Sequence, residues 1–168
     1  MTTLPTVFIT GASSGLGATY AERFARCGHD LVLVARNKSR LDALAMRLRE
    51  QHQIAVEVLQ ADLTNSAELP ALETRLRHDA RIGILINNAG MLQSGHFLEQ
   101  SPEAIESQIA LNITALTRLA AAIAPRLAQS GTGSIVNIGS VVGFSPEFGI
   151  SLYGATKAYV LFLSQGLA

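Results

Sequence analysis

The sequence predicts a single α/β domain of the doubly wound, Rossmann-like class, in which a parallel sheet lies between layers of helices. Three observations predict it. Short apolar runs rich in β-branched residues alternate with stretches of helical spacing along the whole chain. A glycine-rich turn follows the first apolar run and opens the first helical stretch. Parallel strands require crossover helices, and the alternation supplies one at each step.

Five strands are expected, each a short apolar run bounded by polar or turn-forming residues. They cover residues 7–9, 31–34, 55–59, 82–86 and 135–138. Helices are expected over residues 18–27, 39–51, 66–79, 102–129 and 152–168, the fourth with a break or as two helices. Gly28 fits a left-handed C-cap after the first helix. Ser66 fits an N-cap for the third helix, and Ser101 fits one for the fourth.

Composition bounds the kinds of partner. Thirteen Lys and Arg balance thirteen Asp and Glu, so no basic field favours nucleic acid or anionic lipid. The most apolar stretch, residues 115–128, is interrupted by two arginines and a proline, which predicts no membrane-spanning helix. The N-terminal residues carry no leader pattern, so a cytoplasmic location is expected. The single cysteine, Cys27, is expected to pack as an apolar residue on the first helix.

The glycine-rich turn predicts a phosphate-binding loop. Residues 10–17 read Thr-Gly-Ala-Ser-Ser-Gly-Leu-Gly and stand between the first strand and the first helix. Backbone N–H groups at a helix N-terminus approach a pyrophosphate closely where glycine leaves room, and the helix dipole favours its negative charge. The alternative is a tight turn that needs glycine for steric reasons alone.

The end of the second strand predicts which nucleotide binds. An acidic residue there accepts from the adenosine ribose in NAD sites, whereas an arginine accommodates the 2′-phosphate of NADP. Ala35 and Arg36 occupy this place, so NADP is expected in preference to NAD. The alternative is that Arg36 is a solvated surface residue. The four histidines, His96 among them, lack ligand spacing, so no metal is expected.

Tyr153 and Lys157 form a candidate catalytic pair. They stand four residues apart in an expected helix, so their side chains share one face. A phenol is a poor base at neutral pH, and a nearby ammonium stabilises its ionised form. Ser140 follows the fifth strand, at the edge where open α/β sheets bind ligands. By spacing alone, a Tyr–Lys pair on a helix surface is the alternative.

Taken together, these motifs resemble the short-chain dehydrogenase/reductase family. The matching segments are Thr10-Gly11-x-x-x-Gly15-x-Gly17, Asn87-Asn88-Ala89-Gly90 and Tyr153-x-x-x-Lys157. The resemblance implies an NADP-dependent oxidoreductase that interconverts a carbonyl and a secondary alcohol by hydride transfer. The extended branch of such enzymes, which modifies nucleotide sugars, has a different glycine spacing and is disfavoured.

The resemblance also assigns roles to four residues, so that Asn112, Ser140, Tyr153 and Lys157 are the catalytic candidates. Tyr153 would act as the acid or base, and Ser140 would orient the carbonyl. Lys157 would bind the nicotinamide ribose and stabilise the phenolate, while Asn112 would hold a water at a helix break. The cofactor-binding candidates are Thr10, Gly11, Ser13, Ser14, Gly15, Leu16, Gly17, Arg36, Asp62, Leu63, Asn88, Ala89, Gly90, Tyr153 and Lys157. Asp62 would contact the adenine edge, with an Asx turn as the alternative.

Complete family members continue with further helices and strands, so this chain is expected to be a single domain whose last strands are missing. An unpaired sheet edge would then lower its unfolding temperature. A catalytically silent nucleotide-binding or interaction module is therefore the alternative function. Phe144 and Phe148 are the apolar candidates for a substrate wall, although the substrate itself stays open. A homodimer or homotetramer is implied by the resemblance alone.

Overall fold

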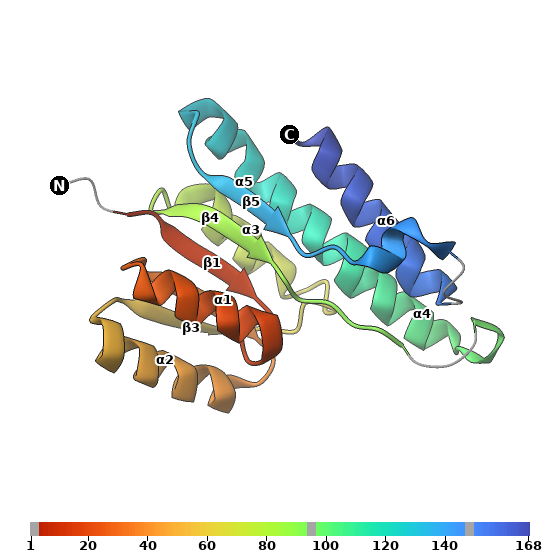
Figure 1. The fold of residues 1–168 in the computed structure, drawn as a ribbon, viewed down its shortest axis with the longest axis horizontal. Coiled ribbons are helices and arrows are strands. Elements are labelled where there is room, and N and C mark those ends of the chain that lie inside the picture. Colours follow the sequence, from red (N-terminus) through yellow and green to blue (C-terminus); the bar gives the residue numbers. More distant parts are fainter. Residues whose placement is uncertain (1–3, 94–96, 147–149) are drawn as a thin grey trace.

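A computed structural model describes residues 4–93, 97–146 and 150–168 of the chain. It contains a parallel sheet of five strands in the order β3-β2-β1-β4-β5 (Figure 1). The strands are β1 (Thr6–Thr10), β2 (Leu31–Ala35), β3 (Val56–Gln60), β4 (Ile82–Asn87) and β5 (Ser134–Asn137). All five expected strands are present, so the predicted Rossmann-like class is confirmed.

Six α-helices connect and follow these strands. They are α1 (Gly15–Arg26), α2 (Lys38–His52), α3 (Leu69–His78), α4 (Pro102–Ile109), α5 (Leu116–Ser130) and α6 (Ser151–Gly166). Short 3₁₀ turns in the described part of the chain include η1 (Phe97–Glu99) and η3 (Val141–Phe144). The expected break between residues 102 and 129 is a π-helical segment, η2 (Ala110–Ala115), so the helical run continues from α4 into α5. Such segments widen a helix locally and are frequent at functional sites.

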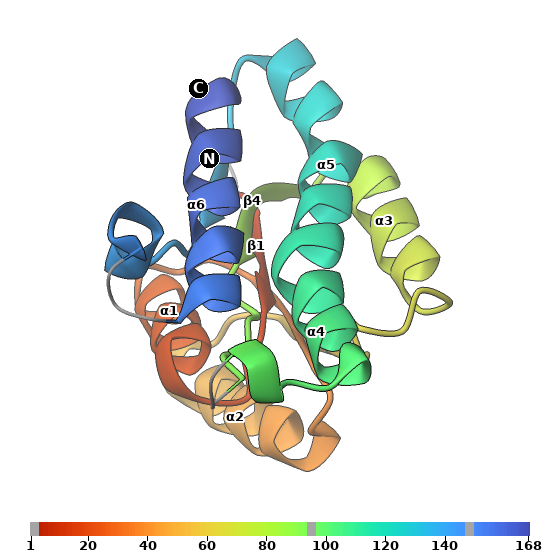
Figure 2. The same cartoon turned by 90° about the vertical axis from the view of Figure 1, so that its right-hand side faces the viewer.

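Helices cover both faces of the sheet because the three inner strands, β2, β1 and β4, present apolar side chains to both faces. On one face, Ala21 of α1 and Leu41 of α2 pack against Ile9 and Leu33. On the other face, α3 and α5 pack against a second apolar cluster around Phe8. Figure 2 shows α3, α5 and α6 side by side. Both clusters contain residues of β1, which therefore lies at the centre of the core.

The strand order creates a crevice at one edge of the sheet. From β1 the chain moves outward to β2 and β3, then returns to place β4 on the other side of β1. The chain after β1 and the chain after β4 therefore lead to helices on opposite faces of the sheet, α1 on one face and α5 on the other. Ligands of open α/β sheets bind at this point of reversal.

The expectations about helix ends are confirmed in part. Gly28 has φ of +85° and follows α1, and the Ser101 hydroxyl accepts from Ala104 N at 3.2 Å at the start of α4. The expected cap at Ser66 is wrong, because α3 begins later, at Leu69. The turn before it is closed by other side chains. Asn65 Oδ1 accepts from the N–H two residues on at 3.0 Å.

The expected packing of Cys27 is also wrong. Helix α1 ends at Arg26, so Cys27 occupies the cap position and its side chain is exposed. A residue at this place has left the helical face that contacts the sheet. The apolar spacing of the helix therefore does not extend to it.

One helical stretch passes a test of length and apolar composition for spanning a membrane. This stretch is Pro102–Ser130, and 44% of an apolar 18-residue segment within it is buried inside the protein. Core helices of soluble proteins pass the same test, and Leu119 and Ile123 of this run belong to the apolar cluster around Phe8. In this structure the run is packed as a core helix.

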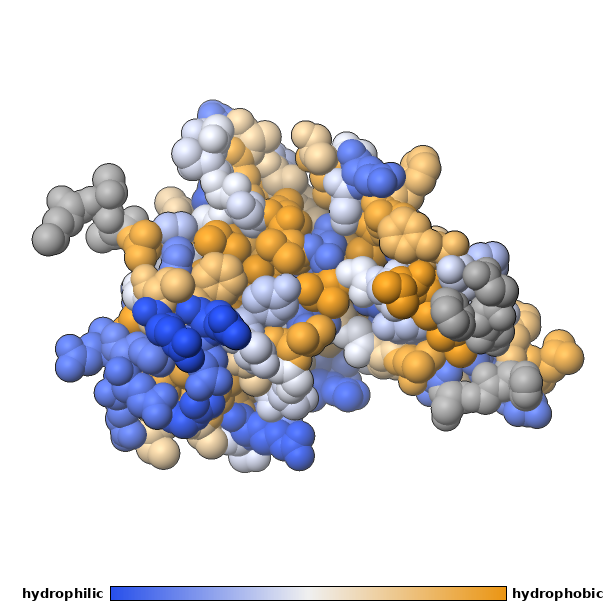
Figure 3. All heavy atoms as spheres, in the orientation of Figure 1, coloured by the Kyte–Doolittle hydropathy of each residue, from blue (hydrophilic) through white to orange (hydrophobic). Residues whose placement is uncertain are grey.

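The surface is uneven in polarity. In Figure 3 hydrophilic side chains gather over α1 and α2, whereas apolar ones gather toward β5 and α6. Large exposed apolar side chains in this second region are Val141, Phe144, Phe162 and Leu167. Beside β5, a groove of about 610 Å³ lies between the ends of α5 and α6. Among the described strands, β5 pairs with β4 alone.

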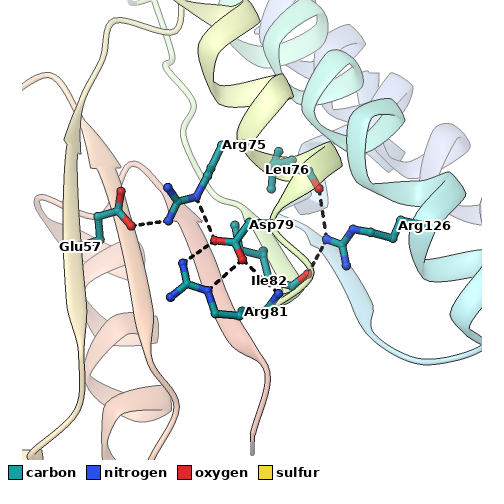
Figure 4. A network of polar contacts seen from close by, with 7 residues as sticks. All are labelled: Glu57, Arg75, Leu76, Asp79, Arg81, Ile82 and Arg126. Atoms are coloured by element: carbon teal, nitrogen blue, oxygen red, sulfur yellow. Dashed lines mark hydrogen bonds and ion pairs between the residues drawn. The ribbon is translucent and has the colours of Figure 1, made fainter.

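A network of ion pairs holds the opposite end of the sheet (Figure 4). Asp79, between α3 and β4, pairs with Arg75 at 3.0 Å and with Arg81 at 2.7 Å. Arg126 of α5 donates to carbonyl oxygens at the end of α3 and the start of β4. The Arg81 side chain hydrogen-bonded to Asp79 lowers the pKa of that carboxyl to about 2. These contacts fasten α3 and α5 to the sheet far from the crevice.

Candidate active site

The crevice at the carboxyl ends of the strands holds a cleft of about 540 Å³. This volume lies within the range of roughly 300–1,000 Å³ that is usual for small-molecule sites. Ten of the expected cofactor-binding residues line it: Gly11, Ser13, Ser14, Leu16, Arg36, Asp62, Leu63, Asn88, Ala89 and Gly90. The structure therefore brings together loops after β1, β2, β3 and β4 around one cavity.

Two of the loop glycines, Gly15 and Gly17, differ in what surrounds them. Gly15 has φ of +55° and faces open space, as a loop that admits a ligand requires. A β-carbon on Gly17 would instead collide with the carbonyl oxygen of Gly11 and the side chain of Asn88. Gly17 thus allows α1 to approach the loop closely. This packing role stands beside the expectation that Gly17 leaves room for phosphate, which stays a prediction.

Thr10, another expected cofactor-binding residue, does not line the cleft. It is buried, and its hydroxyl oxygen accepts from the N–H groups of Asn88 and Ala89, each at 3.0 Å. Asn88 Nδ2 in turn donates to the carbonyl oxygens of Thr10 and Gly11 at 3.0 and 3.2 Å. These bonds join the loop after β1 to the loop after β4 and fix the positions of the two loops relative to each other at the edge of the crevice.

We define the arginine end of the cleft as the wall made by Arg36, Asn37 and Arg40. Asn37 caps α2 by accepting from Arg40 N at 3.0 Å. Lys38 points to another partner, since it pairs with Asp42 at 2.7 Å. Two guanidinium groups at the start of a helix form a wall that suits a phosphate.

Asp62 lines the cleft and also forms the Asx turn that was its alternative role. Its Oδ1 accepts from Thr64 N at 2.9 Å and from Thr64 Oγ1 at 2.8 Å. Burial opposes ionisation of this carboxyl, but the bonds from Thr64 and the nearby charge of Arg36 outweigh it and lower the pKa of Asp62. Leu63 is 5% exposed and belongs mainly to the apolar core.

We define the lysine end of the cleft as Gly90 and Ile138, which line it, together with the adjacent ammonium of Lys157, which is not among the lining residues. Gly90 and Ile138 line the cleft, and Lys157 Nζ donates to the carbonyl oxygen of Ile138 at 2.6 Å. Lys157 is 5% exposed, and this burial lowers its pKa. Its Nζ lies 5.6 Å from the centre of the Tyr153 ring, so the expected pairing of these two side chains on one face of α6 is present.

Asn112 joins three segments beside this end. It lies in the π-helical segment and is 1% exposed. Its Oδ1 accepts from Met91 N at 2.9 Å, and its Nδ2 donates to Met91 O at 2.9 Å and to Thr156 Oγ1 at 3.1 Å. The side chain of Asn112 is therefore occupied in holding the loop after β4 against α6.

Ser140 begins the short turn η3 after β5. Its hydroxyl oxygen accepts from Val142 N at 3.4 Å, and the side chain is half-buried. Within the described part of the chain no hydrogen bond links Ser140 to Tyr153, and neither residue lines the cleft. The two stay candidates on the strength of their positions.

The comparisons with known proteins decide the family. The sequence model of the family described as short chain dehydrogenase matches residues 5–168. The chain belongs to the short-chain dehydrogenase family. An uncharacterised oxidoreductase of Staphylococcus saprophyticus is 37% identical over 160 residues, which cover 95% of this chain and 68% of the relative.

Solved structures of short-chain dehydrogenases superpose closely on this chain. A short-chain dehydrogenase from Sphingobium yanoikuyae in complex with NADPH is 77% identical with a TM-score of 0.96, covering 98% of this chain and 64% of that one. A bulky-bulky ketone specific alcohol dehydrogenase from Comamonas testosteroni is 66% identical with a TM-score of 0.97, covering 99% and 67%. Other curated relatives are covered to about half their length, such as 52% of a very-long-chain 3-oxoacyl-CoA reductase of Danio rerio.

Arg40 is the main residue of this short-chain dehydrogenase that sequence reasoning missed. A lone arginine on the polar face of a helix is usually solvated. The available signal was its spacing, because residue 40 follows Arg36 by four and lies in the first turn of the helix after β2. Ile138 was missed as well, since its contribution is a backbone carbonyl that any residue type offers.

Other expectations fall outside the site or outside the described chain. His96 and Phe148 lie outside the described residues. Phe144 is exposed and lines a separate hollow of about 370 Å³ between η3 and α6. Over residues 4–93, 97–146 and 150–168, no three His, Cys, Asp or Glu side chains cluster as metal ligands.

Proposed function

We propose that this protein is an NADP-dependent oxidoreductase that interconverts a ketone and a secondary alcohol by hydride transfer. One observation carries the proposal. A single cleft extends from Arg36 and Arg40 to Gly90 and Ile138, and the buried ammonium of Lys157 lies beside this second end, where it donates to the carbonyl oxygen of Ile138. A dinucleotide with a 2′-phosphate needs both, and so does a proton-transfer group placed beside its nicotinamide.

The residues present fit NADPH. At the arginine end, Arg36 and Arg40 present guanidinium groups to a phosphate. At the lysine end, a β-carbon on Gly90 would stand 3.4 Å from Asn112 Oδ1 and 3.7 Å from Lys157 Nζ. Glycine therefore places no side chain between the cleft and the nearby ammonium. In this proposal Lys157 would bind ribose hydroxyls, while the turn containing Gly15 would receive the pyrophosphate.

The proton chemistry would be carried by Tyr153 and its neighbours. Bound NADPH would supply the hydride. The Tyr153 hydroxyl would donate a proton to the carbonyl oxygen during reduction and take it back during oxidation. The positive charge of Lys157, 5.6 Å from the ring centre, stabilises the phenolate that remains. Ser140 would donate a hydrogen bond that polarises the carbonyl, and Asn112 would hold the framework.

Relatives support both the cofactor and the substrate class. The relative from Sphingobium yanoikuyae binds NADPH, and the one from Comamonas testosteroni is specific for bulky-bulky ketones. At 77% and 66% identity over nearly the whole of this chain, they favour NADPH and a ketone with two large substituents. The homo-oligomeric state and the cytoplasmic location stay predictions.

Replacement of Tyr153 by Phe tests the proposal. NADPH oxidation with ketones that carry two bulky substituents, such as diaryl ketones, should occur in the wild type. It should fall at least about a hundredfold in Tyr153→Phe, as general acid catalysis contributes that much. NADPH affinity, measured by fluorescence titration, should stay within about threefold because the phenol is not part of the phosphate wall. Equal turnover by both proteins would refute the assigned role of Tyr153.

A second candidate is a nucleotide-binding module without turnover. It is favoured by one feature, namely that Ser140 and Tyr153 do not line the cleft whereas the arginine end is well formed. NADPH binding without oxidation on the whole ketone panel would support this second function. Turnover by the wild type would exclude it.

A further inference from the structure

Thr156 stands between the two residues of the proposed catalytic pair and is itself 1% exposed. Its hydroxyl donates to the carbonyl oxygen of Tyr153 at 2.8 Å. It also accepts from Asn112 Nδ2 at 3.1 Å. A hydroxyl has one hydrogen, so the bond to Tyr153 leaves its lone pairs directed elsewhere, and Asn112 takes one of them.

Asn112 can use Thr156 only because its other bonds are already made. Met91 N donates to Oδ1, which identifies the oxygen and assigns the remaining amide atom as Nδ2. One hydrogen of Nδ2 goes to Met91 O, and the second goes to Thr156. Loss of the Thr156 hydroxyl would therefore leave a buried N–H group of Asn112 without its acceptor.

The position of α6 determines where the ammonium of Lys157 lies. Two side-chain hydrogen bonds tie the described part of α6 to the helical run before it. One is the buried bond between Asn112 and Thr156, and the other is the exposed bond between Thr117 and Tyr159 at 2.9 Å. Only the first lies next to the ammonium, since Asn112 and Lys157 both flank Gly90.

We propose that Thr156 is a positioning residue for the oxidoreductase reaction. By bonding Asn112, its hydroxyl holds the first turns of α6 in the position where the Lys157 ammonium lies beside Gly90 and 5.6 Å from the centre of the Tyr153 ring. The inference rests on the proposed function for its kinetic consequences. The geometric part of it stands without turnover.

The test compares three single variants. Thr156→Val keeps the shape and removes the hydroxyl, Thr156→Ser keeps the hydroxyl, and Tyr159→Phe removes the exposed bond between the same helices. We expect Thr156→Val to lower kcat by about tenfold or more, as small misplacements of catalytic groups do, with NADPH affinity within about twofold of wild type. Thr156→Ser should restore most of kcat, and Tyr159→Phe should match the wild type.

A readout without turnover separates this inference from the proposed function. The ε-carbon resonance of Lys157, followed against pH by NMR, reports the surroundings of the ammonium, and the side-chain amide protons of Asn112 report their exchange with solvent. Thr156→Val should move the Lys157 titration and speed the amide exchange, whereas Tyr159→Phe should change neither. Wild-type behaviour of Thr156→Val, or equal effects from Tyr159→Phe, would overturn the inference. A wild type inactive on all ketones, with these NMR shifts present, would overturn the proposed function alone.

Discussion

Lys157 Nζ donates a 2.6 Å hydrogen bond to the carbonyl oxygen of Ile138. Since Ile138 also lines the cleft, this bond attaches α6 to the end of β5 at the wall of the site. An ammonium has three N–H groups. Among the contacts of the described residues Ile138 takes one, which leaves two for a ligand beside Gly90.

Replacement of Gly90 by Ala should weaken function without unfolding the protein. The added methyl would make ordinary contacts with Asn112 Oδ1 at 3.4 Å and Lys157 Nζ at 3.7 Å, so the melting temperature should change little. It would stand beside the ammonium, where the ligand is expected. NADPH affinity should therefore fall about tenfold, which corresponds to ~1.4 kcal/mol. Isothermal titration measures this, and undiminished affinity would contradict the placement of ligand at this end.

Replacement of Gly17 by Ala should destabilise the fold. A β-carbon there meets the backbone of Gly11, which cannot rotate away, so we expect a loss of about 2 kcal/mol by overpacking. Urea unfolding followed by circular dichroism measures it. Gly166→Ala is the control, because that helical glycine has open space around it and should gain about 0.5 kcal/mol. Similar stabilities for the two variants would disprove the packing role of Gly17.

Removal of either cleft arginine should change the choice of nucleotide. Arg36→Ala and Arg40→Ala should each weaken NADPH binding by about 10- to 100-fold, as expected for the loss of a charge-assisted hydrogen bond. NADH has no 2′-phosphate, so its affinity should stay the same. Lys38→Ala is the matched control, since Lys38 is exposed and paired with Asp42. A loss of NADH and NADPH affinity in equal measure would argue against a phosphate contact.

Stability should depend on Asp79 in a pH-dependent way. Its pKa is lowered to about 2, chiefly by the hydrogen bond from Arg81, so its stabilising effect is fully present above the unfolded value of about 3.9 and is lost as the pH falls through the folded value. Asp79→Asn should cost about 1 kcal/mol at pH 7, allowing for solvent around the exposed Arg81. Urea midpoints of the two proteins should converge between pH 4 and pH 2, in the range where the carboxyl becomes protonated. A constant difference over that range would reject this origin.

Most of the strands and helices, and the family, could be predicted from local sequence patterns. A strand such as Ile82–Asn87 is a run of β-branched and apolar residues, and its burial within the sheet follows from that composition alone. The end of α1 at Gly28 follows from the left-handed conformation that glycine tolerates. Taken together, the motifs at residues 10–17, 87–90 and 153–157 indicated the family, and the first two contribute residues that line the cleft.

Contacts between distant segments could not be predicted in the same way. Thr10 stands inside the glycine motif, yet its hydroxyl is used by Asn88 and Ala89, and only the pairing of β1 with β4 reveals this. Arg40 joins the cleft because α2 begins beside the phosphate loop. The bond between Asn112 and Thr156 depends on how α6 docks, which helical spacing does not encode.

Because β1 is the central strand of the sheet, the two sides of the cleft are built from separate stretches of the chain. The lining residues between 11 and 64, on the side of β2 and β3, include the arginine end, and those between 88 and 138, on the side of β4 and β5, include Gly90 and Ile138 of the lysine end. Under the proposed function, the residues that select the nucleotide and the residues that transfer the proton therefore lie in separate stretches of sequence. Exchange of residues 35–40 should then change the coenzyme without altering the proposed catalytic residues.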